Sequence, residues 1–169
     1  MVKYMDVVYS LEDLEFEWNP SKAQNNYRKH GITFEAAAGA FLDPFHVVGD
    51  ASANQEQRDF AIGHTLSDDL LIVIHIERRQ RIRIISARFV TPVEQNFMHK
   101  VNQLSDVDTF DEDAVVLRVR PRASTPVTLL VPDDVLILLQ QVAIGREMSL
   151  DGLLKLYIGK GLRVDRSQK

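Results

Sequence analysis

The residue types in this chain that could do chemistry are mainly cationic. Lys29 and His30 are adjacent in the sequence, and three arginines stand further along, at Arg58, Arg83 and Arg88. Cleavage of an RNA backbone without a metal needs a group that accepts the 2′-hydroxyl proton, cations that stabilise the pentavalent phosphate, and an acid that protonates the leaving oxygen. A histidine, a lysine and arginines can supply these functions if the fold brings them together.

Two helices are expected on either side of Gly31. Asn19 can cap the first helix with Pro20 at its first position, and Gly31 can end it. Thr33 can cap the second helix, which must end before Pro44 because the residue before a proline disfavours the helical conformation. The adjacent lysine and histidine then form the C-terminal end of the first helix. These signals predict helices over residues 20–30 and 34–42.

Strands are predicted after the second helix. The β-favouring runs are short, and the five residues from Thr65 to Asp69 have the composition of a hairpin loop. Thr91-Pro92-Val93-Glu94 is a capping box with proline at the first helical position, which predicts a third helix to about Leu104. The order α-α-β-β-β-α with antiparallel spacing indicates an α+β domain over residues 1–104. The predicted strands cover residues 45–48, 58–64, 70–75 and 81–89.

The last predicted strand carries several of the candidate residues, and its alternation decides which side chains share a face. Each face of this strand carries both apolar and polar side chains. This favours a central strand that a helix covers on one side and that ends in an exposed polar groove. The alternation places Ile82, Ile84, Ser86 and Arg88 on one face, and Arg81, Arg83, Ile85, Ala87 and Phe89 on the other.

The C-terminal part of the chain differs in charge from the rest. The whole chain carries a net charge of −4. Its acids cluster just after residue 104, in a stretch without periodicity, and three arginines follow, at Arg118, Arg120 and Arg122. We interpret residues 105–122 as a linker that is acidic at first and then basic.

Residues 123–169 are predicted to form a unit of one strand and two helices. A strand over residues 126–131 precedes a helix that Asp133 can cap, and Ser149 can cap the last helix. About 45 residues with one strand cannot bury two apolar helix faces alone, so the unit is expected to form a homodimer. The apolar faces consist of Val135, Leu138, Leu139 and Val142 in the first helix, and of Leu150, Leu153, Leu154, Tyr157, Ile158 and Leu162 in the last.

Composition excludes several classes of protein. The chain has no cysteine, which excludes disulfides and thiolate metal sites. Its histidines show no ligand spacing, so we expect no metal and no cofactor. The longest apolar runs fall far short of the roughly 20 residues that a membrane span needs. There is no basic start followed by an apolar stretch and a cleavage site, so we expect a cytoplasmic protein that does not associate with a membrane.

Four motifs in the N-terminal part resemble the BrnT family of toxins, small RelE-like ribonucleases that cut RNA and stop translation. The motifs are F-E-W-N-P-S-K-A from Phe16, K-H-G-I-T-F from Lys29, R-D-F-A-I-G from Arg58 and R-I-I-S-A-R from Arg83, in the family's order. The resemblance implies a RelE-like antiparallel sheet with helices and an active site in a basic groove. The site residues that it implies are Lys29, His30, Arg58, Ser86 and Arg88.

We assign roles to these residues, each of which has a plainer alternative. His30 or Lys29 would act as base or acid. Arg58 and Arg88 would clamp the phosphate, and the Ser86 hydroxyl would orient a reacting group. A histidine near a helix C-terminus is often only a partner of the helix dipole. The two arginines could instead form structural ion pairs with Glu77 or Glu94.

Residues 125 to about 166 resemble a ribbon-helix-helix domain, the dimeric DNA-binding fold of the partner antitoxin BrnA. In that fold two chains form an antiparallel ribbon that lies in the major groove of DNA, so the resemblance implies that Thr128 and Leu130 face the bases. Leu130 forms no side-chain hydrogen bond and Pro126 has no donor, which argues against base-specific readout. Ser149 and the start of its helix would hold a phosphate.

These features predict a fused protein of the toxin–antitoxin type. An RNA-cleaving domain is kept neutralised by an attached antitoxin-like domain, which dimerises and can contact DNA. A tethered inhibitor faces its target at a millimolar effective concentration when the linker can span the sites. Two alternatives remain open at this point: a DNA-binding transcriptional regulator whose toxin-like domain is inactive, and an active dimeric ribonuclease whose tail only dimerises it.

Overall fold

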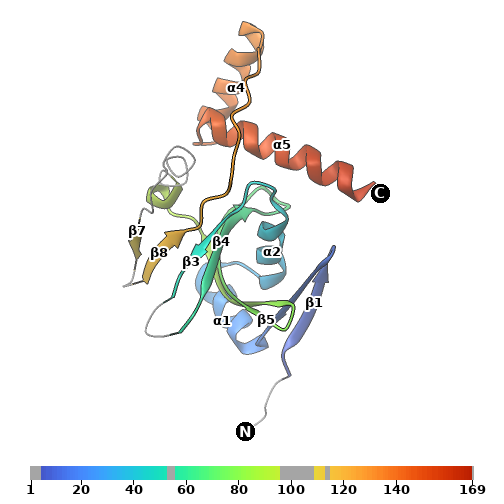
Figure 1. Ribbon diagram of the computed structural model, residues 1–169, viewed down its shortest axis with the longest axis vertical. Coiled ribbons are helices and arrows are strands. Elements are labelled where there is room, and N and C mark those ends of the chain that lie inside the picture. The colour runs from blue at the N-terminus through green and yellow to red at the C-terminus, as the bar shows by residue number, and fades with distance from the viewer. Residues whose placement is uncertain (1–4, 53–55, 96–108, 113–114, 169) are drawn as a thin grey trace.

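The computed structural model describes residues 5–52, 56–95, 109–112 and 115–168. Within these ranges the chain has a mixed α+β fold, built on an eight-stranded sheet in the order β1-β2-β6-β5-β4-β3-β8-β7. Figure 1 shows helices α1 and α2 beside the sheet, and helices α4 and α5 at one end of the molecule. The predicted α+β class is confirmed. The strands β1 to β8 are Val7–Leu11, Leu14–Trp18, Val47–Asp50, Asp59–His64, Leu70–Arg78, Arg81–Phe89, Thr109–Glu112 and Val115–Val119.

The two N-terminal helices begin and end where their caps predict. α1 (Pro20–His30) starts after its cap, Asn19, and ends at Gly31, whose φ of 69° is a conformation that favours glycine. α2 (Phe34–Ala38) continues directly as the 3₁₀ helix η1 (Gly39–Leu42). Both predicted helices are therefore confirmed, the second one with a tighter last turn.

Strands β3 to β6 form the antiparallel meander that the spacing predicts, with the expected five-residue loop between β4 and β5. β3 begins two residues later than predicted because the preceding backbone makes a turn, in which His46 N donates to Asp43 O at 3.0 Å. β5 runs on to Arg78, and Arg79 and Gln80, both at positive φ, turn the chain into β6.

A β-bulge in β6 changes which of its side chains share a face. The pairing with β5 skips one residue, Ile85, which is extra in β6. As a result Ile84 and Ala87 face the same core, while Ser86 and Arg88 face the other side of the sheet. The predicted alternation, with Ile84 on the face of Ser86 and Arg88, is therefore wrong. A strict period of two cannot reveal an inserted residue.

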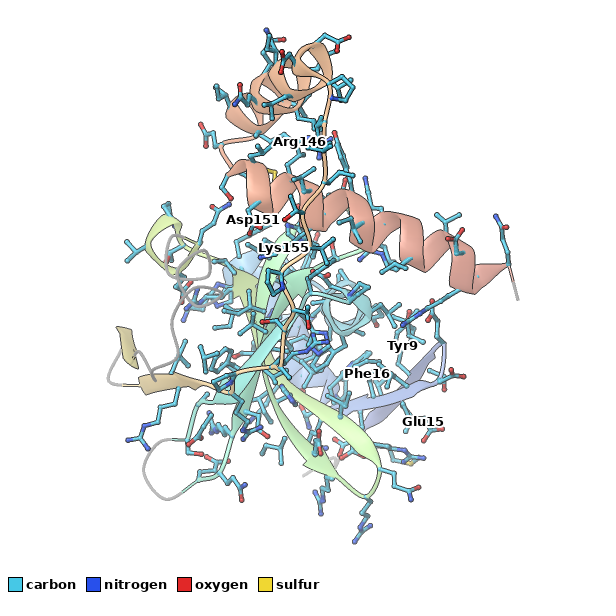
Figure 2. All side chains as sticks on the ribbon, turned by 45° about the horizontal axis from the view of Figure 1, so that its top comes forward. Tyr9, Glu15, Phe16, Arg146, Asp151 and Lys155 are labelled. Carbon is cyan, nitrogen blue, oxygen red and sulfur yellow. The ribbon has the colours of Figure 1, made fainter. Side chains whose placement is uncertain are left out.

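A hairpin that the sequence left unexplained precedes α1. β1 and β2 pair antiparallel, and β2 continues as a parallel neighbour of β6. Tyr9 and Phe16 lie together on this hairpin, with ring centroids 6.4 Å apart (Figure 2). Arg83 of β6 forms ion pairs with Asp6 at 2.7 Å and with Glu17 at 3.1 Å. Arg83 therefore ties the hairpin to the central strand.

The sheet carries an apolar core on each face. The first core lies on the face that α1, α2 and η1 cover, and the second lies on the face of Ser86 and Arg88. Together they fix the meander between two layers of apolar side chains. The first core consists of Phe16, Trp18, Ile32, Phe34, Ala37, Ala38, Ala40, Leu71, Val73, Ile84 and Ala87, and the second of Ala51, Phe60, Ile62, Ile72, Leu117 and Val119.

The predicted linker over residues 105–122 contains two strands. β7 and β8 pair antiparallel with each other, and β8 also pairs with β3. Leu117 and Val119 of β8 are buried in the second core. This close approach requires a glycine in β3, because a Cβ at Gly49 would lie 2.1 Å from the carbonyl oxygen of Arg118. The linker prediction is wrong for these strands, whose pairing depends on a partner far away in the sequence.

The C-terminal unit contains the two predicted helices, α4 (Asp133–Gly145) and α5 (Leu150–Ser167). Ser149 caps α5 as predicted, through a hydrogen bond that its hydroxyl oxygen accepts from the first turn. Asp133 does not cap α4. It is the first helical residue, and Pro132 precedes it without a side-chain cap.

The segment over residues 120–132 has neither helix nor strand. The predicted strand over residues 126–131 is therefore absent from the single chain, and Leu130 within it is 94% exposed. A ribbon would need the same segment of a second copy. Figure 1 shows α4, which follows this segment, pointing away from the sheet.

Leu117→Ala is expected to lower the free energy of unfolding by about 2 to 4 kcal/mol, because it leaves a cavity in the second core. Leu117 is 6% exposed. Leu66→Ala is the matched control: Leu66 is 60% exposed, so its truncation should cost less than about 0.5 kcal/mol. Urea unfolding of the full chain measures both. Equally small effects would show that β8 is not part of the folded sheet.

Candidate active site

The open edge of β6 positions the candidate site. In the described residues β2 pairs only with the first half of β6. Beside the second half, Asn26 of α1 takes the place of a strand: its Nδ2 donates to Ala87 O at 2.9 Å, and Ala87 N donates to its Oδ1 at 3.0 Å. Asn26 Nδ2 also donates to Ile32 O at 3.1 Å. α1 is thereby fixed against the half of β6 that carries two of the implied site residues.

His30 ends α1, and the positive charges of Lys29 and of Arg88 in β6 both act on its imidazole. Burial lowers the pKa of His30 below its ordinary value of 6.5, and the positive charges of Lys29 and Arg88 lower the pKa further. The imidazole is therefore mainly uncharged near pH 7 and can accept a proton. Lys29 is exposed and His30 is half-buried, so the cluster is open to solvent.

Arg88 is held in place by Glu94. Two guanidinium N–H groups donate to the two carboxylate oxygens at 2.9 and 2.7 Å, and Arg88 also donates to Phe89 O at 3.0 Å. Glu94 is only 2% exposed. Burial raises the pKa of Glu94, but hydrogen bonds from Arg88 and Thr91 outweigh burial and leave the pKa below its ordinary value of 4.5. The plainer alternative for Arg88, an ion pair with Glu94, is confirmed.

The capping box that ends at Glu94 is also confirmed. Glu94 N donates to Thr91 Oγ1 at 3.3 Å, and Thr91 N donates to a Glu94 carboxylate oxygen at 2.8 Å. Residues 92–95 are helical, and the rest of the predicted third helix, to Leu104, lies outside the described residues. Glu94 therefore both begins a helix and orients the guanidinium of Arg88.

Ser86 adjoins the cluster, and Arg58 lies apart from it. Ser86 is two residues before Arg88 on the same face of β6. Arg58 directly precedes β4, two strands away, and the register places it four residues along the sheet from the row of Arg88. At about 3.3 Å per residue and about 4.8 Å between strands, the Cα atoms of the two arginines are about 16 Å apart. Arg58 forms an ion pair with Glu56, and a joint role of Arg58 and Arg88 in holding one phosphate stays a prediction.

The predicted DNA-contacting residues lie in the C-terminal unit. Thr128 and Leu130 are exposed on the segment without secondary structure. The Ser149 hydroxyl oxygen accepts a hydrogen bond from Gly152 N at 3.0 Å, so its role in the single chain is to cap α5. Contact of these residues with DNA stays a prediction.

The described ranges hold neither a metal-binding group of side chains nor a membrane-spanning helix. There, no three or more His, Asp or Glu side chains are grouped so as to bind a metal ion. None of the helices in the same ranges has the length and hydropathy of a membrane-spanning segment. His75 is buried in contact with the Phe41 ring, and burial lowers the pKa of its imidazole, which indicates an uncharged core histidine.

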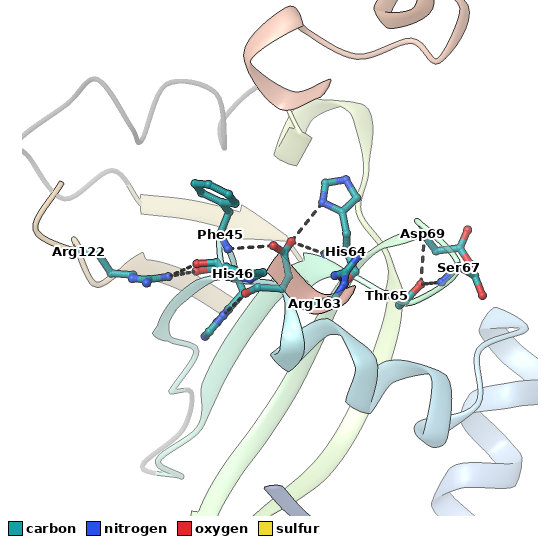
Figure 3. A network of polar contacts seen from close by, with 10 residues as sticks. Phe45, His46, His64, Thr65, Ser67, Asp69, Arg122 and Arg163 are labelled. Carbon is teal, nitrogen blue, oxygen red and sulfur yellow. Dashed lines mark hydrogen bonds and ion pairs between the residues drawn. The ribbon is translucent and has the colours of Figure 1, made fainter. Parts of the chain in front are cut away.

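A second polar cluster lies where α5 crosses the loops that follow η1 and β4 (Figure 3). Asp43 accepts a hydrogen bond from His64 N at 2.8 Å, and its carboxylate lies 3.2 Å from the Nδ1 atom of the same histidine. From α5, Arg163 donates to His64 O at 3.5 Å, and Lys160 forms an ion pair with Asp68 at 2.5 Å. These contacts join the C-terminal unit to the N-terminal domain.

An apolar pocket lies beside this cluster, between the start of α5 and the sheet. Figure 2 labels Asp151 and Lys155, the two charged residues that α5 contributes to its wall. Gln95 is another lining residue, and it directly follows Glu94, the partner of Arg88. α5 therefore reaches towards the segment that holds Arg88. The apolar lining includes Phe45, Val47, Ile62, Leu70 and Met148.

Two residues of the site were missed at the level of the sequence. Glu94 was assigned only as a capping residue and a possible ion-pair partner of an arginine. Its bidentate ion pair with Arg88 depends on the fold. Asn26 was not singled out at all. A signal did exist, because asparagine is a poor helix former and its place in the middle of α1 needs a reason.

A comparison with protein families supports the resemblance in one part of the chain. Residues 18–94 match the family described as "Ribonuclease toxin, BrnT, of type II toxin-antitoxin system". This segment runs from the end of β2 to Glu94 and includes all five implied site residues. No curated protein matches the chain. The resemblance to BrnT is thus confirmed for residues 18–94, and the ribbon-helix-helix resemblance of the tail stays a prediction.

Arg88→Ala is expected to lower the free energy of unfolding at pH 7 by about 2 to 3 kcal/mol, because it leaves the Glu94 carboxylate buried without its partner. This is more than the roughly 0 to 1 kcal/mol that an exposed ion pair contributes, because Glu94 is buried. Adding Glu94→Gln to Arg88→Ala should recover part of the loss. Urea unfolding of the single and double variants measures the coupling.

The loss of stability caused by Arg88→Ala should depend on pH. The lowered pKa of Glu94 stabilises the fold above pH 4.5, and this contribution is lost as the pH falls through the pKa of the folded state. The difference in stability between wild type and Arg88→Ala should therefore shrink below pH 4.5. A difference that is small at pH 7 would show that the ion pair is not formed in solution.

Proposed function

We propose that the N-terminal domain is a BrnT-like ribonuclease that cleaves RNA without a metal, and that the attached C-terminal helices hold it neutralised. The family match over residues 18–94 supports the first half of this proposal. The observation that carries it is the environment of His30 at the end of α1, where burial and the positive charges of Lys29 and Arg88 lower the pKa of its imidazole.

In the proposed reaction His30 accepts the proton of the 2′-hydroxyl, whose oxygen forms a bond to phosphorus. The bond from phosphorus to the 5′ oxygen breaks, and the Lys29 ammonium group donates a proton to that oxygen. The products are a 2′,3′-cyclic phosphate and a 5′-hydroxyl. Arg88, oriented by Glu94, stabilises the charge of the pentavalent phosphate, and Ser86 offers a hydroxyl beside it.

α5 supports the second half of the proposal because it docks on the N-terminal domain of its own chain. Its buried residues are Leu153, Leu156, Gly159 and Arg163. They form one stripe along the helix, and only Leu153 belongs to the apolar face predicted from the sequence. A tether keeps this stripe close to its docking surface, so even modest contacts suffice to hold it there.

α5 acts from a distance on the cluster. Figure 1 shows α5 across one end of the sheet, while α1 lies towards the other end. α5 reaches towards the cluster through the pocket that it shares with Gln95. Neutralisation by α5 would therefore restrain the segment that orients Arg88, and would not need to cover His30.

The tail is also proposed to form a homodimer. Apolar residues on both helices and on the preceding segment remain exposed in the single chain. In a ribbon-helix-helix arrangement two copies would pair residues 126–131 and cover these side chains. The exposed residues are Val127, Leu129 and Leu130 in the segment, Val135, Ile137, Leu138 and Ile144 in α4, and Tyr157, Ile158, Leu162 and Val164 in α5.

DNA binding is the second candidate function, and it depends on this dimer. The paired segments would present Thr128 and Leu130 to a major groove. Leu130 has no hydrogen-bonding group, so phosphate contacts would dominate the affinity, and binding would weaken steeply with salt and select poorly among sequences.

Weaker docking of α5 is expected to increase RNA cleavage by the full chain. Lys160→Glu places a like charge beside Asp68, and loss of the exposed pair plus the new repulsion amounts to about 1 kcal/mol, or about fivefold in activity. Adding Asp68→Lys should restore the pair and reverse the effect. Arg166→Glu, on an exposed part of the same helix, is the control. Cleavage of a fluorescent RNA measures all four proteins.

A fragment ending at residue 122 is expected to show the highest rate of RNA cleavage in the same assay, since it keeps β8 and lacks the tail. If this fragment is folded but does not cleave RNA, the domain is not a ribonuclease. If fragment and full chain cleave equally fast, the tail does not neutralise it.

The full chain is expected to sediment as a dimer, and the fragment ending at residue 122 as a monomer. Leu138→Glu should also give a monomer, because it places a charge on the exposed apolar face of α4. Gln140→Glu adds the same charge at an exposed polar position of the helix and should leave the dimer intact. A dimeric fragment would place the interface in the N-terminal domain.

A further inference from the structure

Asn26 is an unusual residue for the place that it occupies. It lies in the middle of α1 and is 7% exposed, where asparagine costs helix stability and a buried amide needs partners. Its partners are all backbone groups: Ile32 O, Ala87 O and Ala87 N, at 2.9 to 3.1 Å. An apolar residue would pack here and leave those groups unsatisfied, so the amide serves the contact between α1 and β6.

His30 follows Asn26 by four residues and therefore lies on the same face of the helix, one turn further on. Arg88 follows Ala87 in β6. The bonds between Asn26 and Ala87 therefore join helix and strand one helical turn away from His30, whose imidazole is within the electrostatic influence of Arg88. No other described side chain of α1 forms a hydrogen bond to β6.

We propose that Asn26 is a positioning residue of the candidate site: its amide holds the last turn of α1 against β6 and sets where His30 lies relative to Arg88. This inference rests on the proposed ribonuclease function. Its physical consequence can be measured whether or not the protein cleaves RNA, because that consequence is a change in the environment of the His30 imidazole. Among the described residues, the charged groups that act on that imidazole are Lys29 on its own helix and Arg88 on β6, and Arg88 is paired with Glu94.

Loss of the amide should change this environment in a defined direction. If the end of α1 moves away from β6, the His30 ring gains water and moves away from Arg88. Both changes remove causes that lower its pKa, so the pKa should rise towards 6.5. A residue that only stabilises the fold would lower the melting temperature and leave this pKa unchanged.

The test compares Asn26→Ala with Asn25→Ala in the full chain. Asn25 is the neighbouring asparagine and is exposed, so its truncation should alter neither His30 nor activity. An NMR titration of the histidine ring protons, with His30→Gln to assign the signal, measures the pKa. Asn26→Ala should raise the pKa of His30 and reduce kcat for RNA cleavage by about tenfold to a hundredfold, as expected for a misplaced catalytic group.

Asn26→Ser, which keeps one hydrogen-bonding group, serves if the alanine variant does not fold. A folded Asn26 variant in which His30 titrates as in wild type would overturn the proposal. If neither wild type nor the folded fragment ending at residue 122 cleaves RNA but the pKa of His30 rises in the variant, the proposed function fails and the positioning role of Asn26 stands.

Discussion

The backbone of β6 at Ala87 needs two hydrogen bonds that no described strand supplies on that side, and the candidate site depends on how they are made. Unpaired backbone groups in a buried strand are costly, and the Asn26 side chain satisfies both of them. The same contact fixes α1 on the sheet and brings its last turn to Arg88. The helix that satisfies the free backbone groups of β6, α1, is thus also the helix that carries Lys29 and His30.

A second restraint acts on the Arg88 side chain itself. The Glu94 carboxylate fixes the guanidinium in a bidentate pair, and Gln95 next to it lines the pocket below α5. The C-terminal helix is therefore connected to the cluster through two neighbouring residues. This connection gives the attached tail a physical route to the site, although its main contacts are to the loops at Asp43 and Asp68.

Local signals predicted the elements near the site, and long-range contacts decided the rest. The caps Asn19 and Gly31 sufficed to place α1, because they act within one turn of the helix. The bulge at Ile85 was missed because a strict period of two cannot reveal an inserted residue. The pairing of β8 with β3 was missed because the two strands are distant in sequence. The cluster was predicted from residue types and a family resemblance, but the separation of Arg58 from it followed only from the register.

The most direct test of metal-independent RNA cleavage by this cluster is the identity of the RNA ends that the fragment ending at residue 122 produces in the presence of EDTA. The fragment with His30 intact is expected to form 2′,3′-cyclic phosphate and 5′-hydroxyl ends, and the His30→Ala fragment is not, because the 2′-hydroxyl is the nucleophile and His30 accepts its proton. Ends that carry a 5′-phosphate, or cleavage that stops in EDTA, would contradict it.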